Sequence, residues 1–401
     1  MNKTTKGPIL QWGTVAQWAI VYICPNHLIL PKLIFTVTND LSYDQRMQRI
    51  CSSLANNGYE VLLVGRKWRD SSVLKEQPFK QRRLKCWFNK GLLFYGEYNI
   101  RLFFFLLFVG ADAFCAIDLD TILPNYFASF IRNKKRLYDA HELFTEQKEI
   151  VTRPSVHKIW LAIERFAVPK FRHGYTVNLF IRDELNRRYG VDYGIIRNLP
   201  VLSTIQPIEQ AGIQHRFIIY QGAVNEGRSF ETLIPAMKEV DAKLLIVGKG
   251  NFFEQTKQLI EKNNLSTKVE LKGYMAPDEL RQLTPRSIFG LTLFEDAGLN
   301  QYYSLSNRFF DYIMAGIPQV CVGYPEYRAI NDEHEVALLV NDTEQETLVA
   351  ALNKLLDDAV LYERLRLNCL RARQVLNWNS EGEKLTAYWL SLFANQHSSL
   401  T

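Results

Sequence analysis

The sequence predicts an α/β protein built from two successive doubly wound domains, each around a parallel sheet. An apolar run at Leu33–Thr38, a stretch of helical spacing and a second apolar run at Tyr59–Gly65 form a strand–helix–strand unit. The same alternation resumes at Arg216. A chain of 401 residues with 47% hydrophobic residues can bury two such cores. Ligands of such sheets bind beyond the carboxyl ends of the strands, so we expect a cleft between the domains.

The first domain is predicted over residues 33–200. Its first helix carries Met47, Ile50 and Leu54 at helical spacing and closes at Gly58. Further strands are expected at residues 113–118, 136–138 and 174–178. Residues 1–32 are interpreted as an N-terminal extension, with disorder as one reading, because polar residues interrupt their apolar pattern.

The second domain is predicted over residues 215–378, after a linker at 201–214 that lacks periodicity. Helical patterns separate its expected strands, and a long helical run is expected at 344–376. A final helix at 381–393 is expected to pack back on the first domain. The strand candidates are residues 217–221, 243–247, 269–272, 288–294, 318–322 and 337–340.

The net charge and the cysteine content exclude some classes of function. The net charge of +6 suits an anionic substrate or membrane surface but is too diffuse to indicate nucleic acid. The six cysteines form no Cys-x-x-Cys pair and no His/Cys cluster, so we expect no structural zinc site. Reduced core cysteines favour a cytoplasmic protein.

The stretch 80–108 interleaves basic and aromatic residues. This pattern suits contact with a membrane surface, and it also suits a core helix with a solvated flank. The sequence leaves both interpretations open.

The segment from Ser304 to Gly323 is the most informative of the chain. A helix that ends at Gly316 and Pro318 and leads into a strand is half of an α/β unit. The unpaired N–H groups at the start of such a helix attract anions. Arg308 suits a phosphate and Asp311, one turn later, suits the hydroxyl pair of a ribose. With Ser304 and Asn307 they predict a nucleotide-diphosphate clamp.

Two glycine-containing turns follow strands of the second domain. Gly222 allows close approach to the backbone, and Arg228, six residues later, offers forked donors to a diphosphate. Gly248 begins a Gly-Lys-Gly turn where a nucleoside can pack on backbone. Plain tight turns are the alternative for both.

Polar residues at other strand ends are further candidates. His141 and Glu142 follow a strand on the cleft side, where imidazole can contact a substrate hydroxyl or carry a structural hydrogen bond. Asp44 and Arg46 open the first helix, either at the cleft edge or as ordinary capping. Glu295 and Asp296 could bind sugar hydroxyls or form an acidic loop that binds no ligand. These candidates are Asp44, Arg46, His141, Glu142, Glu295 and Asp296.

Together these residues resemble retaining glycosyltransferases of the GT-B fold, family 4 (glycosyl transferases group 1), over roughly Leu33 to Phe393. The matching segments are Phe35–Asp40 with Asp44–Arg46, Tyr138–Glu142, Ile196–Pro200, Gly222–Arg228, and Asp311 with Ala315–Pro318. The resemblance implies two Rossmann-like domains facing across a cleft, transfer with retention of anomeric configuration, and no catalytic metal or other cofactor.

The resemblance also implies roles for residues. His141, with Glu142, would act at the transferred sugar, and Asn39, Asp44 and Arg46 would line the acceptor side. The chain departs from the family where Ala223 replaces an Arg, Arg228 a Lys, Asp311 a Glu, and Tyr303 the Glu that contacts the donor sugar. The residues expected to bind the donor are Gly222, Arg228, Gly248, Glu295, Asp296, Tyr303, Ser304, Asn307, Arg308 and Asp311.

The sequence therefore predicts an enzyme that moves a sugar from a nucleotide-diphosphate sugar to a saccharide or lipid-linked saccharide in bacterial surface polysaccharide synthesis. It would work in the cytoplasm, at the inner face of the plasma membrane if residues 80–108 contact lipid. Two alternatives stay open: a sugar-nucleotide 2-epimerase of GT-B fold, and a non-catalytic protein that binds sugar nucleotides.

Overall fold

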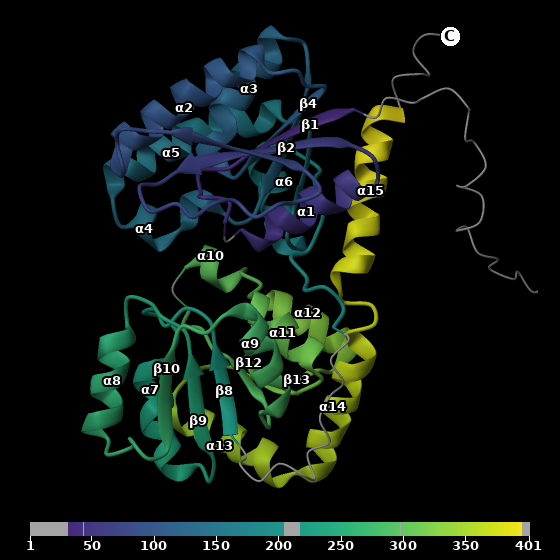
Figure 1. The fold of residues 1–401 in the computed structure, drawn as a ribbon. Coiled ribbons are helices and arrows are strands. Elements are labelled where there is room, and N and C mark those ends of the chain that lie inside the picture. The colour runs from purple at the N-terminus through teal and green to yellow at the C-terminus, as the bar shows by residue number, and fades with distance from the viewer. Residues whose placement is uncertain (1–30, 43, 204–216, 297, 395–401) are drawn as a thin grey trace, which may run out of the picture. The chain divides into compact units, whose positions relative to one another are not determined.

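The computed structural model describes residues 31–42, 44–203, 217–296 and 298–394. The predicted extension therefore lies outside the described residues except for its last two positions, as does most of the predicted linker at 201–214. Residues from Pro31 onward cluster as one compact unit. Within it the chain forms two Rossmann-like α/β domains, which confirms the predicted fold class (Figure 1).

The first domain is a seven-stranded sheet in the order β3-β2-β1-β4-β5-β6-β7, and every neighbouring pair is parallel. Its central strands are almost wholly buried, as expected for a sheet covered by helices on both faces. The strands are β1 (Lys32–Thr36), β2 (Glu60–Lys67), β3 (Lys80–Lys85), β4 (Ala113–Ile117), β5 (Lys135–Ala140), β6 (His173–Thr176) and β7 (Gly194–Ile195).

Helices pack against this sheet. Helix α1 (Gln45–Asn56) lies on one face beside α15 (Trp378–Ala394), whose Trp389 packs against Phe35 at a ring distance of 5.5 Å. The indole of Trp378 also donates to Ser53 Oγ at 2.9 Å. The helices between the other strands are α2 (Gly91–Phe108), α3 (Ile122–Ile131), α4 (Lys148–Val151), α5 (Pro154–Ala167) and α6 (Leu179–Tyr189).

The second domain is a six-stranded parallel sheet in the order β10-β9-β8-β11-β12-β13. Its strands are β8 (Phe217–Gln221), β9 (Lys243–Val247), β10 (Val269–Gly273), β11 (Gly290–Thr292), β12 (Gln319–Val322) and β13 (Ala337–Val340). Its helices are α7 (Phe230–Ala236), α8 (Phe253–Lys262), α9 (Pro277–Leu283), α10 (Leu299–Tyr302), α11 (Asn307–Ala315), α12 (Pro325–His334), α13 (Gln345–Asp357) and α14 (Ala359–Ala372).

Two elements differ from the sequence expectation. Residues 80–85 form the edge strand β3, although their basic residues break the apolar alternation of a strand. The helical run predicted at 344–376 is two helices, because Asp358 leaves the helical conformation and its side chain accepts from Leu361 N–H at 2.9 Å as the cap of α14.

Both sheets reverse their strand order at a central pair, β1 with β4 and β8 with β11. Ligands of such sheets bind just beyond the carboxyl ends of the strands at this point. The loops after β1, β4, β8 and β11 are therefore where a site is expected, and they hold Asn39, Asp118, Gly222 and Glu295.

Candidate functional site

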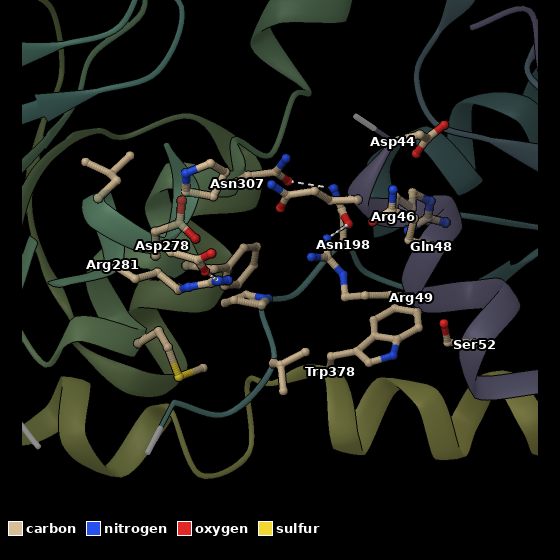
Figure 2. A pocket seen from close by; sticks show the side chains of 18 of the residues that line it. Asp44, Arg46, Gln48, Arg49, Ser52, Asn198, Asp278, Arg281, Asn307 and Trp378 are labelled. Carbon is tan, nitrogen blue, oxygen red and sulfur yellow. Dashed lines mark hydrogen bonds and ion pairs between the residues drawn. The ribbon is translucent and has the colours of Figure 1, made fainter. Parts of the chain in front are cut away.

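A cavity of about 1760 Å³ is lined by residues of both domains. Figure 2 shows part of its wall, with Asp44 and the α1 residues Arg46 and Arg49 on one side and Asp278 and Arg281 on the other. Residues near the carboxyl ends of the strands of both domains therefore line one cavity. The sequence-predicted residues on its wall are Asp44, Arg46, His141, Glu142, Ser304, Asn307 and Asp311.

A buried charged cluster supports His141. Arg46 is 5% exposed and donates to Asp139 Oδ1 and to the carbonyl of Ile196, each at 2.9 Å. Its Nε lies 3.0 Å from His141 Nε2. Two guanidinium nitrogens of Arg46 are therefore hydrogen-bonded within the protein and the third lies against His141, which makes Arg46 a positioning residue for the Asp139–His141 pair.

Two carboxylates flank the imidazole of His141. Its Nε2 lies 3.1 Å from Asp139 Oδ2, and its Nδ1 lies 3.4 Å from Asp118 Oδ2. Burial alone would lower the pKa of His141, but the two carboxylates outweigh it and raise the pKa to about 9. The backbone N–H of His141 also donates to Asp118 Oδ1 at 2.9 Å. At neutral pH His141 is thus a cation held on the cavity wall.

Asp44 caps helix α1. Its Oδ1 accepts from Met47 N–H at 2.9 Å, and its Oδ2 accepts from the amide of Asn39 at 2.6 Å. The capping interpretation left open by the sequence is therefore present in the fold. Asp44 still lines the cavity, whereas Asn39 is not part of its wall.

Glu142 is joined to the second domain by Asn300 of α10. The amide of Asn300 donates to Glu142 Oε2 at 3.0 Å, and its oxygen accepts from Leu143 N–H at 3.1 Å. Gln147 donates to the other carboxylate oxygen of Glu142. Glu142 is thus held by two amides, and the loop carrying His141 is tied to the segment that precedes α11.

Asp311 lies on α11 at the cavity wall. Its Oδ2 accepts from Gln221 Nε2 at 3.2 Å, and Gln221 in turn accepts from Thr284 at 2.8 Å. Burial raises the pKa of Asp311 to about 6, against the hydrogen bond from Gln221 and the charges of Arg49 and Arg281. Its carboxylate is positioned to accept from ligand hydroxyls.

Arg49 shares this part of the cavity. It donates to Asn198 Oδ1 at 2.5 Å, and Asn198 donates to Asn307 Oδ1 at 2.8 Å (Figure 2). Burial, together with the like charge of Arg46, lowers the pKa of Arg49 to about 10. The chain from α1 through Asn198 reaches Asn307, the first residue of α11, so helices α1 and α11 meet at the cavity.

Arg228 and Arg308 come together on the ring of Phe294. The guanidinium carbons lie 4.2 Å and 5.3 Å from its centroid, and that of Arg308 lies 4.3 Å from the centroid of Tyr220. Within the described residues, no carboxylate is in ion-pair distance of either side chain, and Arg228 Nε and Arg308 Nη1 are buried without a hydrogen bond. Burial, with the like charge of Arg308, lowers the pKa of Arg228.

Two partly buried cations without a counter-ion call for an anion. The unpaired guanidinium N–H groups are the donors that phosphate oxygens accept from, and aromatic faces hold both groups in place. Residues 206–369 match the family model of glycosyl transferases group 1. This matched segment contains Arg228, Phe294, Arg308 and Asp311. No curated protein matches the chain by sequence.

Solved glycosyltransferases of GT-B type share the fold of the whole described chain. Sucrose-phosphate synthase from Thermosynechococcus elongatus is 16% identical with a TM-score of 0.76, covering 91% of this chain and 100% of that chain. Anabaena HepE in complex with UDP-glucose is 12% identical with a TM-score of 0.69, covering 90% and 100%. WaaG, a glycosyltransferase involved in lipopolysaccharide biosynthesis, is 16% identical with a TM-score of 0.69, covering 88% and 98%.

Gly222 and Gly248 adjoin the arginine pair. Both have positive φ values, 122° and 151°. A Cβ on Gly248 would lie 1.7 Å from the carbonyl oxygen of Gly222, and one on Gly222 would lie 3.3 Å from Arg308 Nη2. The two turns of the matched segment therefore pack backbone to backbone beside the guanidinium of Arg308, which only glycine permits.

Seven of the ten predicted donor residues are not on the cavity wall: Gly222, Arg228, Gly248, Glu295, Asp296, Tyr303 and Arg308. Three of these, Tyr303, Glu295 and Asp296, belong neither to the arginine pair nor to the glycine turns beside it. Tyr303 stacks on Phe180 with ring centroids 5.6 Å apart and planes 8° from parallel, and its carbonyl accepts from Asn178 at 2.6 Å. Its ring is therefore occupied by the first domain. Glu295 lies beside the Gly227 turn, where its backbone N–H donates to the Gly227 carbonyl at 3.2 Å, and Asp296 is exposed. For these three residues a donor contact stays a prediction.

The sequence interpretation missed several residues that the fold brings to the site. Asp118 and Asp139 end neighbouring strands, and acids at adjacent strand ends were the available signal. Asn300 and Gln221 carried no signal, because their role depends on partners that are distant in the chain. The missed residues with the clearest contacts are Arg49, Asp118, Asp139, Gln221 and Asn300.

Proposed function

We propose that this protein is a retaining glycosyltransferase that moves a sugar from a nucleotide-diphosphate donor to an acceptor hydroxyl. The observation that carries the proposal is the pair Arg228 and Arg308, two cations without a counter-ion in a segment that matches glycosyl transferases group 1. In the reaction the bond between the sugar's anomeric carbon and the diphosphate breaks. A bond to the acceptor oxygen forms, and the hydroxyl proton is released.

Each group has a chemical role in this proposal. Arg228 and Arg308 stabilise the negative charge that develops on the leaving diphosphate, without a metal ion. Asp311 accepts hydrogen bonds from the ribose hydroxyls. The cationic imidazole of His141, held by Asp139 that Arg46 binds in turn, contacts the transferred sugar. Water is displaced as the cavity fills, which limits hydrolysis of the donor.

The acceptor is proposed to be a saccharide, free or lipid-linked, in bacterial surface polysaccharide synthesis. This finer proposal is supported by the fold shared with WaaG, a glycosyltransferase involved in lipopolysaccharide biosynthesis. The cavity volume of about 1760 Å³ exceeds that of an ordinary small-molecule site and leaves room for an acceptor beside a donor. The proposed location is the cytoplasm, at the inner face of the plasma membrane.

A donor screen tests the proposal. UDP, GDP, CDP and dTDP sugars are added in a thermal-shift assay, and the donor that raises the melting temperature is then incubated with saccharide acceptors in the presence of EDTA. We expect one nucleotide class to stabilise the protein and transfer to continue in EDTA. His141→Ala should keep donor binding but lower the transfer rate by about a hundredfold or more.

The outcomes separate the alternatives. Stabilisation by no donor contradicts the proposal. Release of free monosaccharide without acceptor indicates a 2-epimerase, and donor binding without turnover on any acceptor indicates a non-catalytic binding protein. If EDTA abolishes transfer and added Mg²⁺ restores it, only the proposal that no metal ion takes part is contradicted.

Donor affinity should depend on the ionisation of Asp311. Its pKa is raised to about 6, so its carboxylate is charged at neutral pH and protonates as the pH falls through about 6. The donor diphosphate stays ionised over this range, so we expect calorimetric affinity to fall as the pH drops through about 6, by up to about tenfold per pH unit, toward the weak affinity of a protein without this carboxylate. Asp311→Asn is the control. It should bind weakly at every pH, and an equally steep decline in that variant would contradict the assignment.

A further inference from the structure

The face of helix α1 that lines the cavity carries one charged residue among neutral polar ones. Gln45, Arg49, Ser52 and Asn56 line the cavity at spacings of four, three and four residues, so they form one stripe along the helix. The side chains of Gln45, Ser52 and Asn56 make no hydrogen bond among the described residues. We name these four residues the polar stripe. It is about 16 Å long.

Arg49, within the polar stripe, lacks a counter-ion. Its Nη2 donates to Asn198 Oδ1 at 2.5 Å, and its Nε is buried without an acceptor. The carboxylates of Asp311 and Asp44 attract it, but neither forms an ion pair with it among the described residues. Burial and the like charge of Arg46 outweigh this attraction, which is why the pKa of Arg49 stays lowered to about 10. Most of its N–H groups are therefore free to bind an anion.

A second cation of the first domain lines the same cavity. Lys75 lies in the loop between β2 and β3, is exposed, and forms no ion pair among the described residues. The carboxylates that this domain contributes to the wall, Asp44 and Glu142, already accept hydrogen bonds from the protein. Apart from the cluster around His141, the first domain therefore offers the cavity two unpaired cations and a row of neutral polar groups.

The donor does not need these cations. In the proposed function the two negative charges of its diphosphate lie at Arg228 and Arg308 in the second domain, where two guanidinium groups are available for them. The ribose at Asp311 is neutral. A further anionic group at Arg49 therefore has to come from the other substrate, which binds on the side of the first domain.

We propose that the acceptor is an oligosaccharide with an anionic group, a carboxylate or a phosphate ester, which lies along the polar stripe with this group on Arg49. The free N–H groups of Arg49 donate to the anion, as guanidinium groups do to carboxylates and phosphates. The amides and the hydroxyl of Gln45, Ser52 and Asn56 exchange hydrogen bonds with sugar hydroxyls. Because the stripe is longer than one hexose ring, it fits more than a monosaccharide. The inference rests on the proposed function and names the class of its acceptor.

Matched saccharides test the charge preference. The probes are glucose- and galactose-based trisaccharides that carry a hydroxyl, a carboxylate or a phosphate at C6 of the terminal residue, titrated calorimetrically into the full chain. We expect a charged trisaccharide to bind about ten- to a hundredfold more tightly than its neutral counterpart, the range expected for hydrogen bonds to a charged group. Its KM in transfer should be lower by a similar factor. The tighter of the two charged forms shows whether the anion is a carboxylate or a phosphate.

Two substitutions of Arg49 test whether this residue reads the charge. Arg49→Gln keeps a hydrogen-bonding side chain without charge, so the KM of the charged acceptor should rise to about that of its neutral counterpart, with donor affinity as in the wild type. Arg49→Lys keeps the charge and should give an intermediate KM, an order that a merely structural role would not produce. Arg165→Gln, at an exposed arginine of α5 in the same domain, is the matched control and should keep the wild-type KM.

The outcomes separate this inference from the transfer reaction. The charged trisaccharide should still bind when Arg228 and Arg308 are both replaced with Met, because its site lies in the first domain. A charge preference that depends on Arg49 without any transfer contradicts the proposed function alone. Equal binding of charged and neutral trisaccharides, no binding of any charged one, or a preference that survives Arg49→Gln overturns the inference. If Arg49→Gln weakens donor binding instead, the inference is also overturned and Arg49 belongs to the nucleotide site.

Discussion

Replacing Arg228 and Arg308 together with Met is expected to weaken binding of the nucleotide sugar by roughly two to four orders of magnitude. A hydrogen bond to a charged group contributes about 1.5–3 kcal/mol, so two such contacts contribute about 3–6 kcal/mol to donor affinity. Met keeps an unbranched apolar chain in place of each arginine stem, whereas the guanidinium contacts with Phe294 and Tyr220 are lost. Calorimetric titration with the donor found in the screen measures the change.

The unliganded double variant should unfold at a temperature no lower than that of the wild type. The two guanidinium groups repel each other without a counter-ion in the described chain, and burial with this repulsion lowers the pKa of Arg228. Removing both charges relieves that repulsion. Arg364→Met, at an exposed site on α14, is the control and should bind donor normally. A double variant that folds and retains wild-type affinity would contradict the diphosphate site.

Replacing Arg46 with Met is expected to lower the free energy of unfolding by about 3–5 kcal/mol at neutral pH. The substitution leaves the carboxylate of Asp139, which is fully buried, without its guanidinium partner. The carbonyl of Ile196 also loses its donor. Chemical denaturation measures the change. Arg187→Met, which breaks a pair on the exposed side chain of Arg187 with Glu184, should leave the free energy of unfolding close to that of the wild type.

The pH dependence of this loss identifies its cause. Burial would raise the pKa of Asp139, but Arg46 and His141 hold it below the ordinary value, so the pair stabilises the wild type at neutral pH and this contribution is lost only in acid below about 4. Without Arg46 the carboxyl of Asp139 protonates at higher pH, and burying a neutral carboxyl costs less free energy than burying a charged one. The difference between variant and wild type should therefore shrink as pH falls. A second change, Asp139→Asn, should recover part of the loss; no recovery would argue against a buried charge that His141 alone compensates too weakly.

The order of strands and helices could be predicted from the sequence because it depends on short-range patterns. The apolar strands β1 and β2, and helix α11 closed by Gly316 with a φ of 72°, follow from local periodicity and local backbone conformation. The edge strand β3 could not be predicted in this way. Its residues are half exposed, and its strand conformation comes from pairing with β2.

By itself the sequence determined the two α/β domains and the polar start of α11, which carries Arg308 and Asp311 one turn apart. Tertiary structure alone decided which charges meet. It brought Arg228 close to Arg308, 80 residues later in the chain. It also placed Arg46 beside His141 and stacked the ring of Tyr303 on that of Phe180. The physical reason is that conformation at one residue depends on near neighbours, whereas the energy of a charge depends on partners that loops of other strands supply.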